Sequence, residues 1–192
     1  EFDYAAYDVD GRTVIVAETL AERVSKAVGK DFGTPVARVK GEQLEGLKFR
    51  HPLYERDSIA VLADYVTLEQ GTGAVHTAPG HGQEDYVAGM QNGIQVYCPV
   101  DGAGRLYHTA DEPGALPEVL VGKSVWEANP IVVELLKEAG ALLGYQPIEH
   151  SYPHCWRCHK PTIFRATEQW FIGMERNDLR QKALEAIGRV KW

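Results

Sequence analysis

The feature that most constrains this fold is an Asp10-Gly11 pair between two segments of alternating residues in "YAAYDVDGRTVIVA". Such a pair readily adopts the positive φ angles of a two-residue type I′ turn, whose twist matches that of two antiparallel strands. The segment therefore predicts a β-hairpin, and this part of the chain is expected to be β structure.

A short helix and further strands are predicted around this hairpin. Leu20, Val24 and Val28 recur at helical spacing and Gly29 supplies a C-cap, so "AETLAERVSKAVG" predicts an amphipathic helix. The β-rich stretches "TPVARVKG" and "SIAVLADYVTL" predict strands. The polar, Pro-containing segment "EQLEGLKFRHPLYERD" is interpreted as the separator between them.

Three more helices are predicted. "QEDYVAGMQN" has a helical pattern, ends near Gly93 and leads into the apolar strand "IQVYCPV". "NPIVVELLKEAGA" has Asn129 as N-cap, Pro130 as first helical residue and Gly140 as C-cap. "NDLRQKALEAIG" predicts a last helix that is capped by Asn177. Strands and helices together indicate a mixed α/β fold.

Composition limits the partners that such a chain can have. It has 192 residues and a formal net charge of −7, so charge does not predict a broad nucleic-acid surface and any such contact must be local. No apolar run is long enough to cross a bilayer, and three cysteines argue against a secreted disulfide framework. We therefore expect a cytoplasmic protein that makes no membrane contact. Because the sequence lacks an initiator Met, we interpret it as a piece of a longer chain.

The stretch "GTGAVHTAPGHGQEDY" at residues 71–86 combines glycines with histidines and acids. Its glycines let the backbone approach a ligand closely, and the helix start after Pro79-Gly80 favours anions. The alternative is that the histidines are solvated turn residues and the acids complement the helix dipole. Metal binding is disfavoured because His76-x4-His81 is not a zincin pair, and the glycines lack the Lys and hydroxyl of a phosphate-binding loop.

This stretch, with "HSYPHCWRCHKPTIFRATEQWF" and "NPIVVELLKEAGALL", resembles the editing insertion of bacterial isoleucyl-tRNA synthetases, class I enzymes that charge tRNA with isoleucine. The resemblance extends over nearly the whole chain. It implies a β-barrel-like editing domain of the class Ia synthetases, decorated by helices. It also implies hydrolysis of mischarged valyl-tRNA(Ile), because a hydrophobic pocket separates isoleucine from valine by only about 1–3 kcal/mol.

The resemblance divides the chain into two parts. Residues 1–147 correspond to the editing domain, incomplete on its N-terminal side because the family's "TTPWT"-like threonine-rich strand is absent. We therefore expect weak hydrolysis or none from this chain alone. Residues 148–192 correspond to a cysteine knuckle and a segment that returns to the catalytic core, in which Trp170 and Phe171 are expected to pack.

The resemblance also implies roles for single residues. Asp85 matches the acid that holds the α-ammonium group of the substrate, and His76 matches the histidine that limits the side-chain pocket and positions the ester. Water is expected to attack the ester carbonyl, and no metal is required. Glu84 is expected only to shape the start of the helix. His81 is expected either to contact the substrate or to shape the turn. The residues expected to form walls close to the ligand are Gly71, Thr72, Gly73 and Gly80.

The segment "HCWRCH" at residues 154–159 leaves three interpretations open. Cys-x-x-Cys-His is the attachment motif of c-type haem, which requires an exported protein. Cys155 and Cys158 with their flanking histidines can instead be half of a zinc site, and Cys98 is the remaining cysteine. Some members of the resembled family complete such a zinc site with a second Cys pair, which implies half a site here. Two reduced thiols in a surface turn are the third interpretation.

The partners implied by the resemblance are the 3′ end of tRNA(Ile) carrying valine and the rest of the synthetase chain. ATP and Mg²⁺ would belong to the catalytic domain of the parent enzyme, and editing itself requires no cofactor. Two other functions remain open: a module that binds the tRNA 3′ end without hydrolysis, and a metal or haem protein centred on residues 154–159. The basic residues expected to contact tRNA phosphates are Arg38, Lys40, Lys48 and Arg50.

Overall fold

The predicted hairpin is the centre of a three-stranded antiparallel sheet. The computed structural model describes residues 2–110 and 116–191. In it, β1 (Asp3–Val9) pairs with β2 (Arg12–Ala17) on one edge and with β3 (Ala37–Lys40) on the other. Asp10 and Gly11 have φ angles of 53° and 77°, both positive, as a type I′ turn requires. The predicted hairpin and the strand in "TPVARVKG" are therefore confirmed.

One face of this sheet carries the larger of two hydrophobic clusters. The 3₁₀ helix η1 (Glu18–Leu20) leads directly into α1 (Ala21–Val28), and Gly29 ends α1 in the left-handed conformation at φ 68°, as predicted. The apolar side of α1 packs on the hairpin, which is how an amphipathic helix gains most of its stability. The buried residues of this cluster are Ala5, Tyr7, Val9, Val16, Ala17, Leu20, Ala21, Val24 and Phe32.

The remaining named strands are short, and the described strands do not close into a barrel. β4 (Lys48–Arg50) pairs with β5 (Asp57–Ile59) in a separate two-stranded sheet, and the rest of "SIAVLADYVTL" is not a strand. Residues 74–78 and 94–99 run without ladder pairing. A barrel requires every strand to be paired along both edges. The mixed α/β expectation is thus confirmed, whereas its β-barrel part is not seen in the described ranges.

Two helices flank the region that carries the glycines and histidines. α2 (Gln83–Gln91) ends close to Gly93, as predicted, and α3 (Val125–Glu138) ends before Gly140, which has a φ of 62°. The predicted start of α3 is wrong, because the helix includes Pro130 instead of beginning there. Ser124 and Glu127 form a capping box whose reciprocal hydrogen bonds start the helix earlier.

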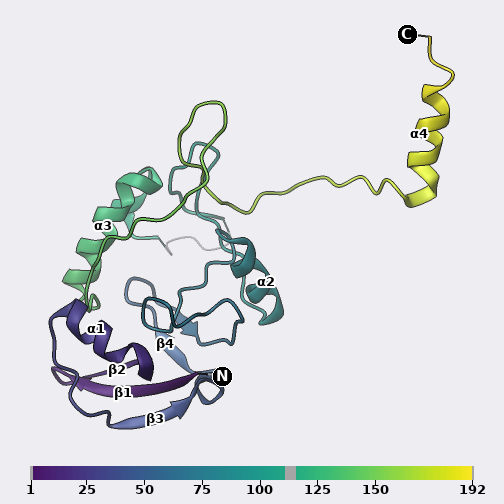
Figure 1. Ribbon diagram of the computed structural model, residues 1–192. Helices are drawn as coiled ribbons and strands as arrows, with labels where there is room; N and C mark the ends of the chain where they lie inside the picture. The colour runs from purple at the N-terminus through teal and green to yellow at the C-terminus, as the bar shows by residue number, and fades with distance from the viewer. Residues whose placement is uncertain (1, 111–115, 192) are drawn as a thin grey trace.

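The second hydrophobic cluster is small and joins α3 to the 3₁₀ helix η3 (Glu118–Leu120). Its buried members are Leu116, Leu120 and Ala128, with Leu106, Ile131, Val132 and Leu135 packed against them. Together the two clusters position the hairpin with α1 and the segment with α3 as separate units of the core. In Figure 1 α3 stands next to α1 on one side of the body, and α2 lies on the other side.

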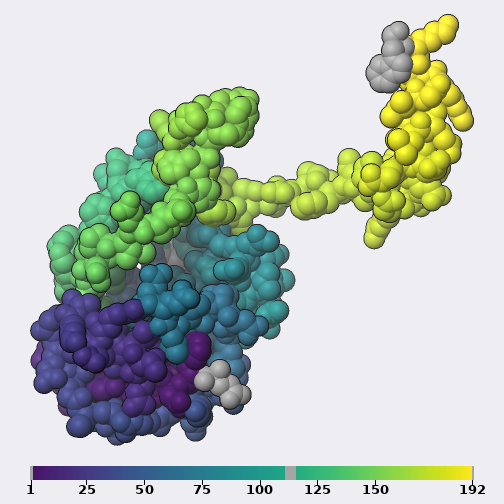
Figure 2. Space-filling model, viewed as in Figure 1, coloured from purple at the N-terminus to yellow at the C-terminus, as the bar shows by residue number. Residues whose placement is uncertain are grey.

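The last helix stands away from the rest of the molecule. η4 (Arg176–Asp178) precedes α4 (Leu179–Ile187). Asn177 and Asp178 both have positive φ angles, so α4 begins only at Leu179. Its N-cap is therefore Asp178, not the predicted Asn177. An extended segment connects α4 to the body (Figures 1 and 2). Trp170 and Phe171 on this segment are 99% and 87% exposed, so the expectation that they pack is wrong in this chain.

The surface area reflects this open arrangement. The accessible surface is 14447 Å², whereas a compact monomer of this mass would expose about 9,100 Å². Much apolar surface is therefore left in contact with water. No helix in the described ranges is both long and apolar enough to cross a membrane.

Backbone contacts at Gly80 generate a stability prediction. Replacing Gly80 with alanine is expected to lower the free energy of unfolding by about 1–3 kcal/mol or more, because the new Cβ would lie 2.1 Å from the carbonyl oxygen of Tyr97. Urea denaturation followed by circular dichroism measures the loss. Gly102→Ala is the matched control, since nothing lies within 4 Å of its Cβ position. Equal stability of the two variants would contradict this packing.

Candidate functional site

The glycine-rich turn is fixed to the hairpin by backbone contacts. The Ala17 amide donates to the carbonyl oxygen of Thr72 at 2.8 Å, and the Tyr4 hydroxyl donates to that of Gly73 at 2.6 Å. A Cβ on Gly73 would lie 2.5 Å from the Ala17 Cβ, and Gly73 has a φ of 79°. Only glycine meets both conditions, so this position holds the turn against the sheet.

The other predicted wall residues occupy different environments. Gly71 is exposed, with a φ of 75° and no atom within 4 Å of its Cβ position. The Thr72 hydroxyl bonds locally with the backbone of Ala74. Gly80 is buried, and its carbonyl oxygen accepts from the Ala166 amide at 2.7 Å. Gly71 and Thr72 are thus placed where a ligand can reach them, whereas Gly80 supports the chain around the turn.

Asp85 lies in the first turn of α2 and faces back into the turn. Its Oδ2 accepts a hydrogen bond from the Ala78 amide at 3.1 Å, and a Cβ on Gly82 would lie 2.8 Å from the same oxygen. The side chain is half-buried. An ionised carboxylate offers about four acceptor positions on its two oxygens, so this group can hold the turn and still accept from a cationic ligand.

His76 lies beside a second histidine that the sequence interpretation did not single out. His76 is exposed and His51 is half-buried, and they are close enough for their charges to interact. Burial, with the nearby positive charges of Arg56 and His76, lowers the pKa of His51 from its ordinary value of 6.5 to about 4. His51 Nδ1 accepts from the backbone amides of Leu53 and Tyr54 at 3.1 and 3.2 Å. The ring is therefore neutral, with its proton on Nε2.

Aromatic and cationic side chains complete the surroundings of His51. Its ring lies 4.3 Å from the ring of Tyr54, and the Arg56 guanidinium lies 5.0 Å from the centre of Tyr54 and 5.8 Å from that of Tyr97. His51, Tyr54 and Arg56 come from the segment interpreted as a separator, whereas Tyr97 comes from "IQVYCPV". The sequence signal was the cluster "HPLYER", in which a histidine, a tyrosine and an arginine follow one another within six positions.

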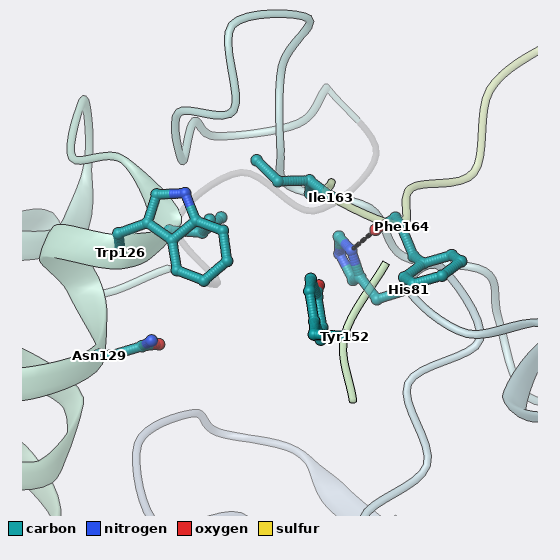
Figure 3. Close-up of a pocket in the computed structure, with 7 residues that line it drawn as sticks. His81, Trp126, Asn129, Tyr152, Ile163 and Phe164 are labelled. Atoms are coloured by element: carbon teal, nitrogen blue, oxygen red, sulfur yellow. Dashed lines mark hydrogen bonds between the residues drawn. The ribbon is translucent and has the colours of Figure 1, made fainter. Parts of the chain in front are cut away.

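His81 contacts a distant part of the chain. Its Nδ1 lies 2.9 Å from the carbonyl oxygen of Phe164. It lines a cavity of about 230 Å³ that neither Asp85 nor His76 lines (Figure 3). The structure therefore brings the predicted residues onto one continuous turn but not into one cavity.

The cysteine pair forms a tight turn of its own. The Cys155 amide donates to the carbonyl oxygen of Lys160, and the His159 amide donates to that of Cys155, both at 2.8 Å. Hydrogen bonds from the amides of Cys158 and Arg157 lower the pKa of the Cys155 thiol. A tetrahedral zinc site requires four ligands, and the described residues contain no group of three or more His, Cys, Asp and Glu that could hold a metal. The pair alone therefore does not complete a site.

The basic residues expected to meet tRNA are largely engaged with acids on the surface. Arg38 pairs with Glu18 and Lys40 with Asp3, each at 2.7 Å. Lys48 lies 3.5 Å from Asp57. Exposed pairs of this kind contribute roughly 0–1 kcal/mol, so phosphates can compete for these cations.

The pKa of His51 generates a pH prediction. The unfolded chain takes up this proton near pH 6.5 and the folded chain only near pH 4. The free energy of unfolding should therefore be highest above about pH 6.5 and should decrease as the pH falls toward 4. Urea denaturation across this range measures the slope, which is expected to be shallower in His51→Gln. An unchanged slope in the variant would show that His51 does not titrate as described.

Comparison with known proteins places this turn in a family context. The chain matches no protein-family model. It is 54% identical to isoleucine–tRNA ligase of Nitratidesulfovibrio vulgaris, 50% identical to that of Geobacter sulfurreducens and 48% identical to that of Fervidobacterium pennivorans. Each match covers 100% of this chain and 20% of the relative. From its first residue to its last, the chain is therefore homologous to a segment that makes up about one fifth of these isoleucine–tRNA ligases.

Proposed function

We propose that this chain is a segment of an isoleucine–tRNA ligase and that its glycine-rich turn hydrolyses valine from mischarged tRNA(Ile). The observation that carries the proposal is Asp85, a half-buried carboxylate that is oriented by the Ala78 amide beside an open glycine turn. A carboxylate held in this way is suited to accept charge-assisted hydrogen bonds from an ammonium group. The ATP-dependent attachment of isoleucine to tRNA would belong to other parts of such an enzyme.

The proposed activity answers a limit of amino acid recognition. Isoleucine and valine differ by one methylene, which a hydrophobic pocket distinguishes by only about 1–3 kcal/mol. A second site that admits valine and excludes isoleucine removes the wrong product after it forms. Such a site needs two features: an acceptor for the α-ammonium group and a pocket that limits the size of the side chain.

Asp85 and His76 would supply these two features. Asp85 binds the α-ammonium group and so orients the ester in the turn. His76, exposed beside the neutral ring of His51, limits the side-chain pocket and positions the ester without transferring a proton. Water attacks the ester carbonyl carbon, the bond to the ribose oxygen breaks, and that oxygen takes up a proton as free valine and tRNA are released. No metal takes part.

Loss of Asp85 should strongly weaken selective hydrolysis. In the full-length synthetase that contains this segment, Asp85→Ala is expected to lower kcat/KM for deacylation of valyl-tRNA(Ile) about 10- to 150-fold, as removal of a charged hydrogen bond worth about 1.5–3 kcal/mol predicts. The rate of release of radiolabelled valine measures this, with isoleucyl-tRNA(Ile) as the substrate that should resist hydrolysis.

Glu84→Ala is the matched control, because Glu84 precedes Asp85 in the same first turn of α2 and is exposed. It should retain deacylation. Equal activity of the two variants would contradict the role of Asp85. If the wild-type synthetase bound valyl-tRNA(Ile) but released no valine, the segment would be a module that only binds the tRNA 3′ end.

A further inference from the structure

A cavity separate from Asp85 and His76 lies between the N-terminal turn of α3 and the turn that carries His81. Its volume is about 230 Å³, and Trp126, Asn129, Tyr152 and Phe164 are among its lining residues. Figure 3 shows side chains from α3 on one side and His81 with Phe164 on the other. Three parts of the chain that are far apart in sequence thus meet around one hollow.

The walls of this cavity carry partly exposed aromatic rings, and Tyr152 is held in place. Trp126, Tyr152 and Phe164 are 47%, 37% and 52% exposed. The Tyr152 ring packs edge-on against Trp126 at 6.4 Å, and its hydroxyl donates to the carbonyl oxygen of Thr162 at 2.9 Å. Rings that are fixed but exposed offer flat faces for stacking, which is how proteins bind unpaired bases.

Polar groups accompany these rings. The Asn129 side chain points from α3 toward Tyr152 in Figure 3, and its amide offers both a donor and an acceptor. The His81 ring is held through Nδ1 by the carbonyl oxygen of Phe164. An amide can hydrogen-bond to the edge of a nucleobase, and neighbouring aromatic rings can stack on its face.

We propose that this cavity binds one unpaired nucleobase of the tRNA 3′ end, an inference that rests on the proposed function. Its volume is smaller than the roughly 300–1,000 Å³ of pockets for drug-sized ligands, so it admits a single planar ring system. His81 lies four residues before Asp85 on the same turn, so a base held against His81 tethers the strand whose ester Asp85 orients.

The charge of the cavity distinguishes this contact from phosphate binding. Among the residues that the structure describes, the lining contains no Lys, Arg, Asp or Glu. Binding through stacking changes little with salt, whereas contacts to phosphates weaken steeply as salt increases. The cavity therefore contributes a salt-insensitive part of the affinity for the 3′ end.

Fluorescent base substitution tests the proposal. The probe is tRNA(Ile) with 2-aminopurine placed in turn at the unpaired 3′ positions, titrated with the full-length synthetase that contains this segment. At one position the wild-type protein should quench the fluorescence by stacking. Trp126→Ala and Tyr152→Ala should reduce that quenching and raise Kd about 5-fold or more, as alanine substitution at base-stacking sites does. Trp126→Phe, which keeps a smaller ring, should be intermediate.

Tyr145→Ala is the matched control. Tyr145 is 69% exposed, and its neighbour Gly144 packs beside Val28 of α1, at the opposite end of α3 from Trp126. It should bind and quench as the wild type does. The proposal is overturned if no 3′ position depends on Trp126 and Tyr152 more than on Tyr145, as when another part of the synthetase covers the cavity.

The deacylation assay separates this failure from failure of the proposed function. If Asp85→Ala abolishes valine release while the cavity variants quench normally, the editing site stands and the base site is wrong. If Asp85→Ala hydrolyses normally while the cavity variants lose quenching, the base site stands and the editing assignment is wrong.

Discussion

The close approach of glycine backbone to neighbouring backbone is the constraint on which this structure depends. Gly73 lies against Ala17 of the hairpin, and Gly80 lies against the carbonyl oxygen of Tyr97, at separations that no side chain permits. These contacts attach the segment from Gly71 to Gly82 to two parts of the chain at once. The segment leads directly into the first turn of α2.

The same geometry links stability to the proposed chemistry. Asp85 accepts from the Ala78 amide and so both closes the turn and presents a carboxylate whose orientation is fixed before a ligand arrives. Preorganised polar groups of this kind avoid reorganisation during the reaction. Beside them, His51 is neutral above about pH 4 because burial and neighbouring cations disfavour its protonation. The charge of His51, the neighbour of His76, therefore stays constant through the physiological pH range.

Local signals predicted the elements that local interactions determine. The Asp10-Gly11 turn, the end of α1 at Gly29 and the position of α2 needed only residues close in sequence. The start of α3 is locally encoded too, in the Ser124 to Glu127 capping box, which precedes the competing helix-start signal at Pro130. The barrel was inferred from resemblance, and strand pairing depends on contacts that no local pattern reports. For the candidate site, the turn was found from its glycines. His51 was missed because its proximity to His76 is tertiary.

The most direct test of the central claim is a binding measurement that isolates the α-ammonium group. Isothermal titration calorimetry would compare a non-hydrolysable amide analogue of valyl-adenosine with its counterpart lacking the amino group, using the full-length synthetase and its Asp85→Ala variant. The wild type is expected to prefer the ammonium-bearing compound by about 10- to 150-fold, and this preference is expected to disappear in the variant. A preference of equal size in both proteins would contradict the central claim.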